Sequence, residues 1–114
     1  MRVMVVWEPI LPTDWEPPTT SVLSRIHNPG VTQFWDHDHL IAHVISSELE
    51  SDLSAPKPRC CLSKGNLWDF AGVYPKGALW QDSPPKPVFG DGPVANVQQA
   101  LRRALTTLLT QKNK

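Results

Sequence analysis

Two adjacent cysteines, Cys60 and Cys61, are the only thiol-bearing residues in the chain. A dithiol could carry out thiol–disulfide exchange or hold a soft metal ion or an arsenical, because thiolates favour such partners. Reversible disulfide chemistry normally uses two cysteines separated by two residues, and adjacent cysteines are poorly placed to pair with each other. Lys57 and Arg59 would favour thiolate formation only slightly. We expect a packing role, with a diverged thiol oxidoreductase or a soft-metal-binding protein as alternatives.

Potential metal ligands are densest between positions 36 and 43. His39 and His43 are four residues apart and would share one face of a helix, the spacing used in helical zinc sites. The catalytic glutamate of the H-E-x-x-H motif is absent, and the sequence suggests no third ligand. We expect this face to be solvated, with Asp36 or Asp38 capping the helix. A metal site at His39 and His43 is the alternative.

Three carboxylates and two tryptophans lie close together near the N-terminus. They are Glu8, Asp14, Glu16, Trp7 and Trp15. Carboxylates beside an aromatic wall could hold a cationic ligand or serve in general acid–base chemistry. The structural interpretation is that Asp14 closes an Asx turn. No cysteine or serine–base pair accompanies these residues, so we assign no catalytic residue and expect no cofactor.

The elements around these acidic residues place them at the end of a strand. The continuous apolar run Val3–Trp7 predicts a strand buried on both faces. A proline-rich loop follows, and then Thr19-Thr20-Ser21 supplies N-cap residues for a helix from about Thr20 to Ile26. Ligands of open α/β sheets bind beyond the carboxyl ends of parallel strands, so we predict a ligand or partner site here. Its expected residues are Pro12, Asp14, Trp15, Glu16 and Thr19.

Three further strand-like segments follow along the chain. Val31–Trp35 is β-branched and aromatic, which predicts a second strand parallel to the first. Residues 50–65 have the composition of a connecting loop. We expect a third strand over Asn66–Tyr74, with Ala78–Trp80 as its antiparallel hairpin partner and a short edge strand at Val88–Phe89.

Two segments show helical periodicity. The first is His37–Leu49, whose predicted buried residues are Leu40, Ile41, Val44, Ile45 and Leu49. The second runs from Val94 to about Thr110, and residues 111–114 should fray. Its predicted solvent-facing residues are Gln98, Gln99, Arg102 and Arg103.

The resulting order is β-α-β-α-β-β-α, which predicts an α/β domain over residues 1–114 with a mixed central sheet flanked by helices. This order resembles the core of the thioredoxin fold. Thioredoxins carry Trp-Cys-Gly-Pro-Cys where the first strand enters the first helix, and the matching residues here are Trp15-Glu16-Pro17-Pro18-Thr19. Both cysteines are missing, and no proline precedes Leu67, where the family has its cis-proline. Phe89-Gly90-Asp91-Gly92-Pro93 is similar to the start of the family's last strand and helix. The resemblance implies a thioredoxin-like domain that lacks the redox motif.

Composition narrows the class of function. The 114 residues carry a formal net charge of zero, and basic residues do not cluster beyond Arg102-Arg103, which argues against nucleic-acid binding. No apolar run approaches the roughly 18 residues of a membrane span. The N-terminus lacks the features of a signal peptide, so we expect a cytoplasmic protein.

These observations favour a non-redox binding or interaction module over an enzyme. Its ligand would be a small molecule or a protein. The five tryptophans also leave open an exposed apolar surface for self-association as a homodimer.

Overall fold

A computed structural model of the chain describes residues 1–9, 16–63 and 65–111. The fold is mixed α/β, as predicted. The chain divides into two compact units, Met1–Ile41 and Ala42–Lys114. Among the described residues, no helix is long and apolar enough to cross a membrane.

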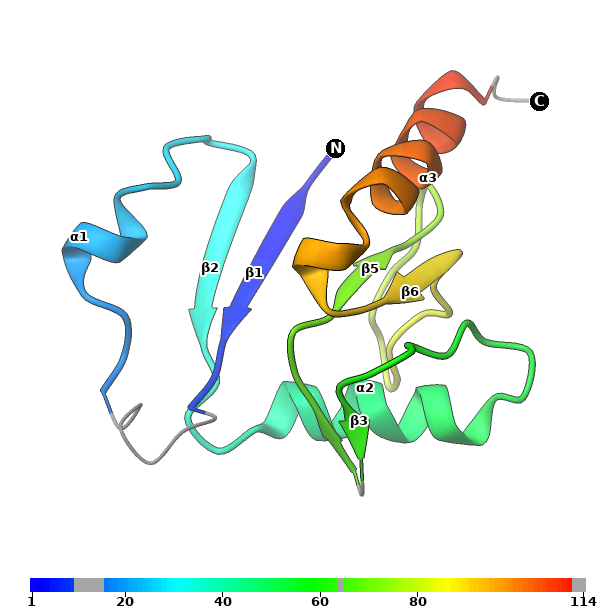
Figure 1. Ribbon diagram of the computed structural model, residues 1–114, viewed down its shortest axis with the longest axis horizontal. Coiled ribbons are helices and arrows are strands. Elements are labelled where there is room, and N and C mark those ends of the chain that lie inside the picture. The colour runs from blue at the N-terminus through cyan, green and yellow to red at the C-terminus, as the bar shows by residue number, and fades with distance from the viewer. Residues whose placement is uncertain (10–15, 64, 112–114) are drawn as a thin grey trace. The chain divides into compact units, whose positions relative to one another are not determined.

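The first unit contains a pair of parallel strands. Strand β1 (Val3–Trp7) pairs with β2 (Val31–Trp35) in a register that sets Val3 beside Val31 and Trp7 beside Trp35. Figure 1 shows the two strands side by side, running in the same direction. The predicted parallel pairing is therefore confirmed. Helix α1 (Thr20–Leu23) lies between them in sequence and ends three residues earlier than expected.

The two faces of this strand pair differ in burial. Side chains alternate between the faces of a strand, so Val5 and Trp7 lie on the same face as Gln33 and Trp35, and all four are half-buried. The opposite face is exposed, and Met4 on it is 68% accessible. The prediction that β1 is buried on both faces is therefore wrong. The end of α1 accepts a hydrogen bond from Gln33, which lies on the half-buried face.

Helix α2 (Leu40–Ser51) begins three residues later than predicted. The carboxylate of Asp36 accepts hydrogen bonds from the backbone N–H groups of Leu40 (2.8 Å) and Ile41 (2.9 Å), which have no partner within the helix. Capping by Asp36 is therefore confirmed. His39 has a φ of 58°, a left-handed conformation that keeps it out of the helix.

The buried face of α2 differs from the predicted one. Leu49 is 2% exposed, and Ala42 and Ser46 are buried with it, whereas Leu40 is 65% and Val44 40% exposed. The core cluster contains Ala42, Leu49, Ala55 and Leu67, with Ile45, Leu62 and Phe70 packed against it. Small residues at helical spacing from Leu49 thus face the core, a pattern that the larger apolar side chains obscure in the sequence.

The predicted third strand is split in two. Strand β4 (Asn66–Leu67) forms a tight antiparallel hairpin with β3 (Leu62–Ser63), and β5 (Ala71–Val73) follows after a break. The break contains Asp69, which has a φ of 47°. This left-handed residue interrupts extended pairing.

Strand β5 pairs antiparallel with β6 (Phe89–Asp91), and the pairing continues where the N–H of Val88 donates to the carbonyl of Val73 (2.8 Å). The expected partner, Ala78–Trp80, is not a strand. The described strands therefore form three two-stranded sheets, and the expected single central sheet is not observed.

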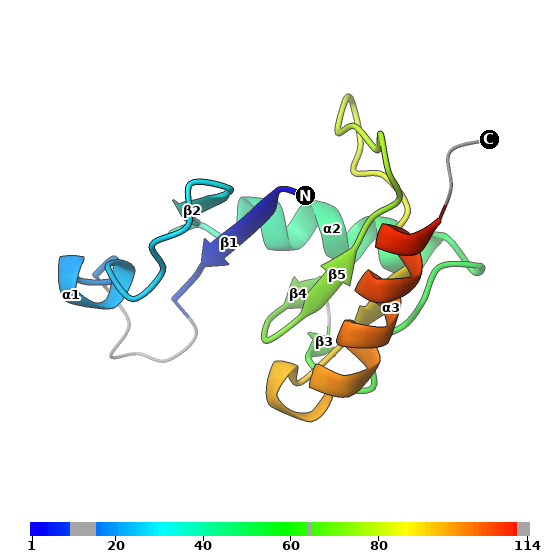
Figure 2. The same cartoon turned by 90° about the horizontal axis from the view of Figure 1, so that it is seen from above.

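The second unit ends in a 3₁₀ turn (Val94–Asn96) and helix α3 (Gln98–Thr110), which lies beside β5 (Figure 2). The predicted single helix is thus interrupted at Val97, which is buried. The predicted polar face is confirmed, since Gln98, Gln99, Arg102 and Arg103 are all exposed.

Two aspartates accept hydrogen bonds that connect the loops of this unit. Asp91 accepts hydrogen bonds from the backbone N–H of Arg59, from its side-chain Nε and from the N–H of Gly92, each at 2.9 Å. Asp69 accepts one from the N–H of Val94 (3.0 Å). A side chain at position 92 would collide with the carbonyl oxygen of Asp69, so this close approach requires glycine.

Candidate functional site

A hollow of about 300 Å³ lies at the carboxyl ends of β1 and β2. Its lining residues are Trp7, Glu8, Glu16, Pro18, Val22 and Trp35. Trp7 and Trp35 are the last residues of their strands and are register partners, so the parallel pairing brings both to one edge of the sheet. The hollow therefore lies where ligands of open α/β sheets bind, the location that the sequence analysis favoured.

Hydrogen bonds fix the indole of Trp7. Its Nε1 donates to Oε1 of Gln33 (2.9 Å), and Nε2 of Gln33 donates to the carbonyl of Leu23 at the end of α1 (3.0 Å). This chain of bonds connects β1, β2 and α1 behind the hollow. The Trp35 ring contacts the ring of His37 edge-on, with centroids 6.1 Å apart. Both tryptophans that line the hollow thus have defined neighbours.

A histidine–carboxylate pair stands beside the hollow. Oε2 of Glu8 lies 3.0 Å from Nδ1 of His39, and the Glu8 side chain is only 12% exposed. Glu8 directly follows β1 and His39 follows β2 by four residues, so the parallel register brings them together. The sequence does not reveal this pairing, because its only signal is that both residues follow strands that end at the same edge.

The carboxylates give the hollow a negative electrostatic character. Glu8 and Glu16 line it, and none of its described lining residues is lysine or arginine. The remaining lining side chains are two indoles, a proline and a valine, which present apolar surface. Such a surface can hold a ligand that combines an apolar body with a positive charge.

The predicted site residues fall into three groups. Glu16 lines the hollow and is exposed to solvent. Thr19 is the N-cap of α1, and its Oγ1 accepts a hydrogen bond from the N–H of Val22 (3.3 Å). Pro12, Asp14 and Trp15 lie outside the described residues.

The prediction that His39 and His43 share one helix face is wrong. Helix α2 begins at Leu40, so the two histidines do not share a helix face. His39 is next to Glu8, whereas His43 lies beside the turn at Gly65. In the described part of the chain, no group of three or more His, Cys, Asp or Glu side chains is arranged to hold a metal ion.

Cys60 and Cys61 are joined by a disulfide, so the expectation that they would not pair is wrong. Cys61 adopts a φ of 73°, and its carbonyl accepts a hydrogen bond from the N–H of Trp68 (3.0 Å). This left-handed residue forms the bend that leads into β3. Metal capture requires thiolates, so the pair in this form does not offer a soft-metal site.

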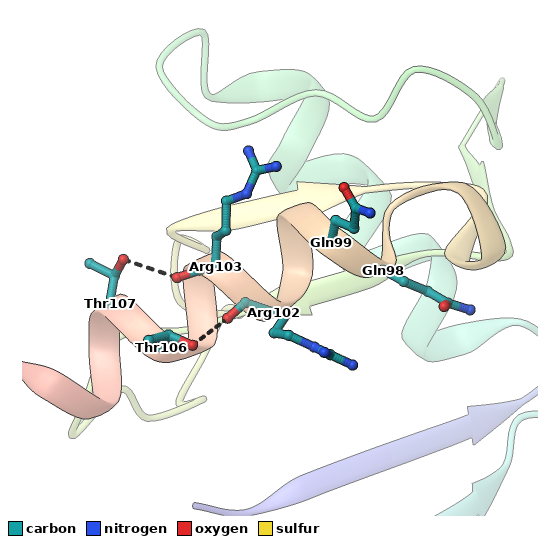
Figure 3. A pocket seen from close by; sticks show the side chains of 6 residues that line it. All are labelled: Gln98, Gln99, Arg102, Arg103, Thr106 and Thr107. Atoms are coloured by element: carbon teal, nitrogen blue, oxygen red, sulfur yellow. Dashed lines mark hydrogen bonds between the residues drawn. The ribbon is translucent and has the colours of Figure 1, made fainter.

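A second hollow, of about 730 Å³, lies on the polar side of α3 (Figure 3). Its lining residues are Gln98, Gln99, Arg102, Arg103, Thr106 and Thr107. The hydroxyls of Thr106 and Thr107 donate to the backbone carbonyls of Arg102 and Arg103 (both 2.9 Å). All six residues belong to one helix, so the described lining supplies no opposing wall, and a small ligand would be poorly enclosed.

No protein-family model, no curated protein and no solved structure matches this chain. The assignment of function therefore depends on the geometry described above.

Proposed function

We propose that this protein is a non-redox binding module that holds a small ligand in the hollow at the carboxyl ends of β1 and β2. The main support is the register pairing of Trp7 with Trp35, which puts two tryptophans at one edge beside two glutamates. Small-molecule sites are concave, largely apolar and carry a few polar groups, with volumes of roughly 300–1,000 Å³. The hollow combines apolar side chains with two carboxylates, and its volume lies at the lower end of that range.

The proposal includes a thioredoxin-like order of elements without redox chemistry. The parallel unit β1–α1–β2 and the antiparallel pair β5–β6 followed by α3 support this order. The segment Trp15–Thr19, where thioredoxins carry their two cysteines, contains none. The chain's own cysteines lie far along the sequence, before β3. A binding function therefore fits the chain better than dithiol exchange, and an enzymatic use of the Glu8–His39 pair is the second candidate.

Nuclear magnetic resonance tests the binding function directly. Each tryptophan gives one indole N–H signal in a ¹⁵N spectrum, and Trp7→Phe and Trp35→Phe variants would assign the two signals of interest. We expect a mixed set of small cationic, anionic and neutral compounds to contain members that shift both signals. Trp80, which is 46% exposed, is the internal control and should not shift. If no compound moves Trp7 or Trp35, or if shifts occur only at α3, the proposal is wrong.

A further inference from the structure

We infer that the ligand of this hollow is a small alkylammonium cation, held by the carboxylate of Glu16 and the indoles of Trp7 and Trp35. This inference rests on the proposed function and names its ligand class. It concerns the described lining residues, all of which belong to the unit Met1–Ile41.

The charge of the lining selects against anions. Glu8 and Glu16 are both acidic, and none of the described lining residues is lysine or arginine. The basic side chain that faces Glu8 is His39, whose Nδ1 lies 3.0 Å from the Glu8 carboxylate. Glu16 lines the hollow and is exposed to solvent, so its side chain is accessible to an entering ligand. An anion would meet like charge here, whereas a cation would meet at least one accessible carboxylate.

The aromatic walls favour an organic cation over a metal ion. Tryptophan is the best aromatic partner for a cation, and the attraction grows when the cation is shielded from water. Metal ions prefer several oxygen, nitrogen or sulfur ligands, and the described residues offer no group of three such side chains. An alkylammonium group matches both parts of the lining, because its charge suits Glu16 and its carbon atoms suit Trp7, Trp35 and Val22.

The hydrogen bond of the Trp7 indole to Gln33 is compatible with binding an alkylammonium cation. Its Nε1–H is already bonded to Gln33, so the polar atom of the indole is satisfied by the protein. What Trp7 offers a ligand is therefore its apolar surface and π electrons, not a hydrogen-bond donor. The size of the hollow, about 300 Å³, suits a free small molecule rather than a long segment of chain.

Choline and its neutral carbon isostere, dimethylbutanol, provide a matched pair of probes. Both would be titrated into the full chain while the indole signals of Trp7 and Trp35 are followed. We expect choline to bind about tenfold more tightly than the isostere, because the isostere lacks the charge that attracts the indoles and the carboxylate. Glu16→Gln should weaken choline binding by about threefold to fivefold, because it removes one exposed carboxylate. Glu50→Gln, an exposed carboxylate on α2 with the same change of charge, is the control and should leave the affinity unchanged.

The outcomes separate this inference from the function on which it rests. Equal binding of choline and the isostere, or choline binding unaffected by Glu16→Gln, would overturn the cation assignment while leaving the hollow as a ligand site. If a peptide that carries trimethylated lysine binds more tightly than choline, the inference of a free small-molecule ligand is wrong, and the ligand is an ammonium group on a protein chain. If neither these probes nor the mixed compound set shifts Trp7 and Trp35, the proposed function itself fails.

Discussion

Ser46 is fully buried in α2, and its hydroxyl has no hydrogen-bond partner among the described residues. A buried hydroxyl without a partner loses its hydration and gains nothing in exchange. We expect Ser46→Ala to raise the free energy of unfolding by about 1 kcal/mol, measured by chemical denaturation. Ser47→Ala, an exposed change of the same type on the same helix, controls for the higher helix propensity of alanine. A lower stability for Ser46→Ala than for Ser47→Ala would mean that the Ser46 hydroxyl makes a bond that the structure lacks.

Asp91 shows how one carboxylate can organise a loop. The backbone N–H of Arg59 is the main cause that lowers the pKa of Asp91, with the Arg59 side chain and the N–H of Gly92 contributing in the same direction. Because the folded state lowers this pKa, the ionised carboxylate stabilises the fold above the unfolded pKa of about 3.9. That stabilisation is lost as the pH falls toward the folded pKa.

We therefore expect Asp91→Asn to lower the free energy of unfolding by about 1–3 kcal/mol near neutral pH. The difference from the unaltered protein should shrink as the pH falls below about 3.9 toward the folded pKa, because the native carboxyl then also loses its charge. Denaturation curves recorded at a series of pH values from neutral downwards would measure this. Asp82→Asn, at an exposed position, is the matched control. A loss of stability that does not depend on pH would contradict the assigned role of the Asp91 charge.

At the scale of the elements, features that depend on neighbouring residues, such as helix caps, were predicted better than features that depend on contacts between distant segments. Thr19 and Asp36 were recognisable as caps because a cap bonds to N–H groups only a few residues away. The buried face of β1 and the partner of β5 were not recognisable from the sequence, because both depend on packing between segments that are distant in sequence. The short edge strand expected at Val88–Phe89 is observed as β6, which begins at Phe89, but the sequence did not show that it pairs with β5.

The face of α2 gives a direct test of this account of packing. Leu49 is 2% exposed and Leu40 is 65% exposed, although the sequence pattern assigned both to the core. Leu49→Ala should lower the free energy of unfolding by about 2–5 kcal/mol, the usual cost of truncating a buried leucine. Leu40→Ala removes the same atoms from an exposed position and should cost less than about 1 kcal/mol. Equal losses in thermal or chemical denaturation would show that the predicted face was right after all.

At the scale of the whole molecule, the candidate site belongs to one of the two units. All its described lining residues lie within Met1–Ile41, and α1 and the parallel register of β1 and β2 build it. The sequence indicates Glu16 and the neighbourhood of Trp7 and Glu8, because these residues surround the end of an apolar run. It does not indicate Trp35, which enters the site only once the second strand is aligned with the first. A parallel register is set by tertiary contacts, so one sequence does not reveal which strand ends will meet.

The central claim is that a small ligand occupies the hollow between Trp7 and Trp35, and intermolecular nuclear Overhauser effects measure this most directly. The spectrum would be recorded on the full chain with the tightest-binding compound of the mixed set. We predict cross-peaks from the ligand to the indole protons of both Trp7 and Trp35 and to the methyl groups of Val22, which line the same hollow. Cross-peaks to Arg102, Arg103 or Thr106 on α3, with none to the two tryptophans, would contradict the claim.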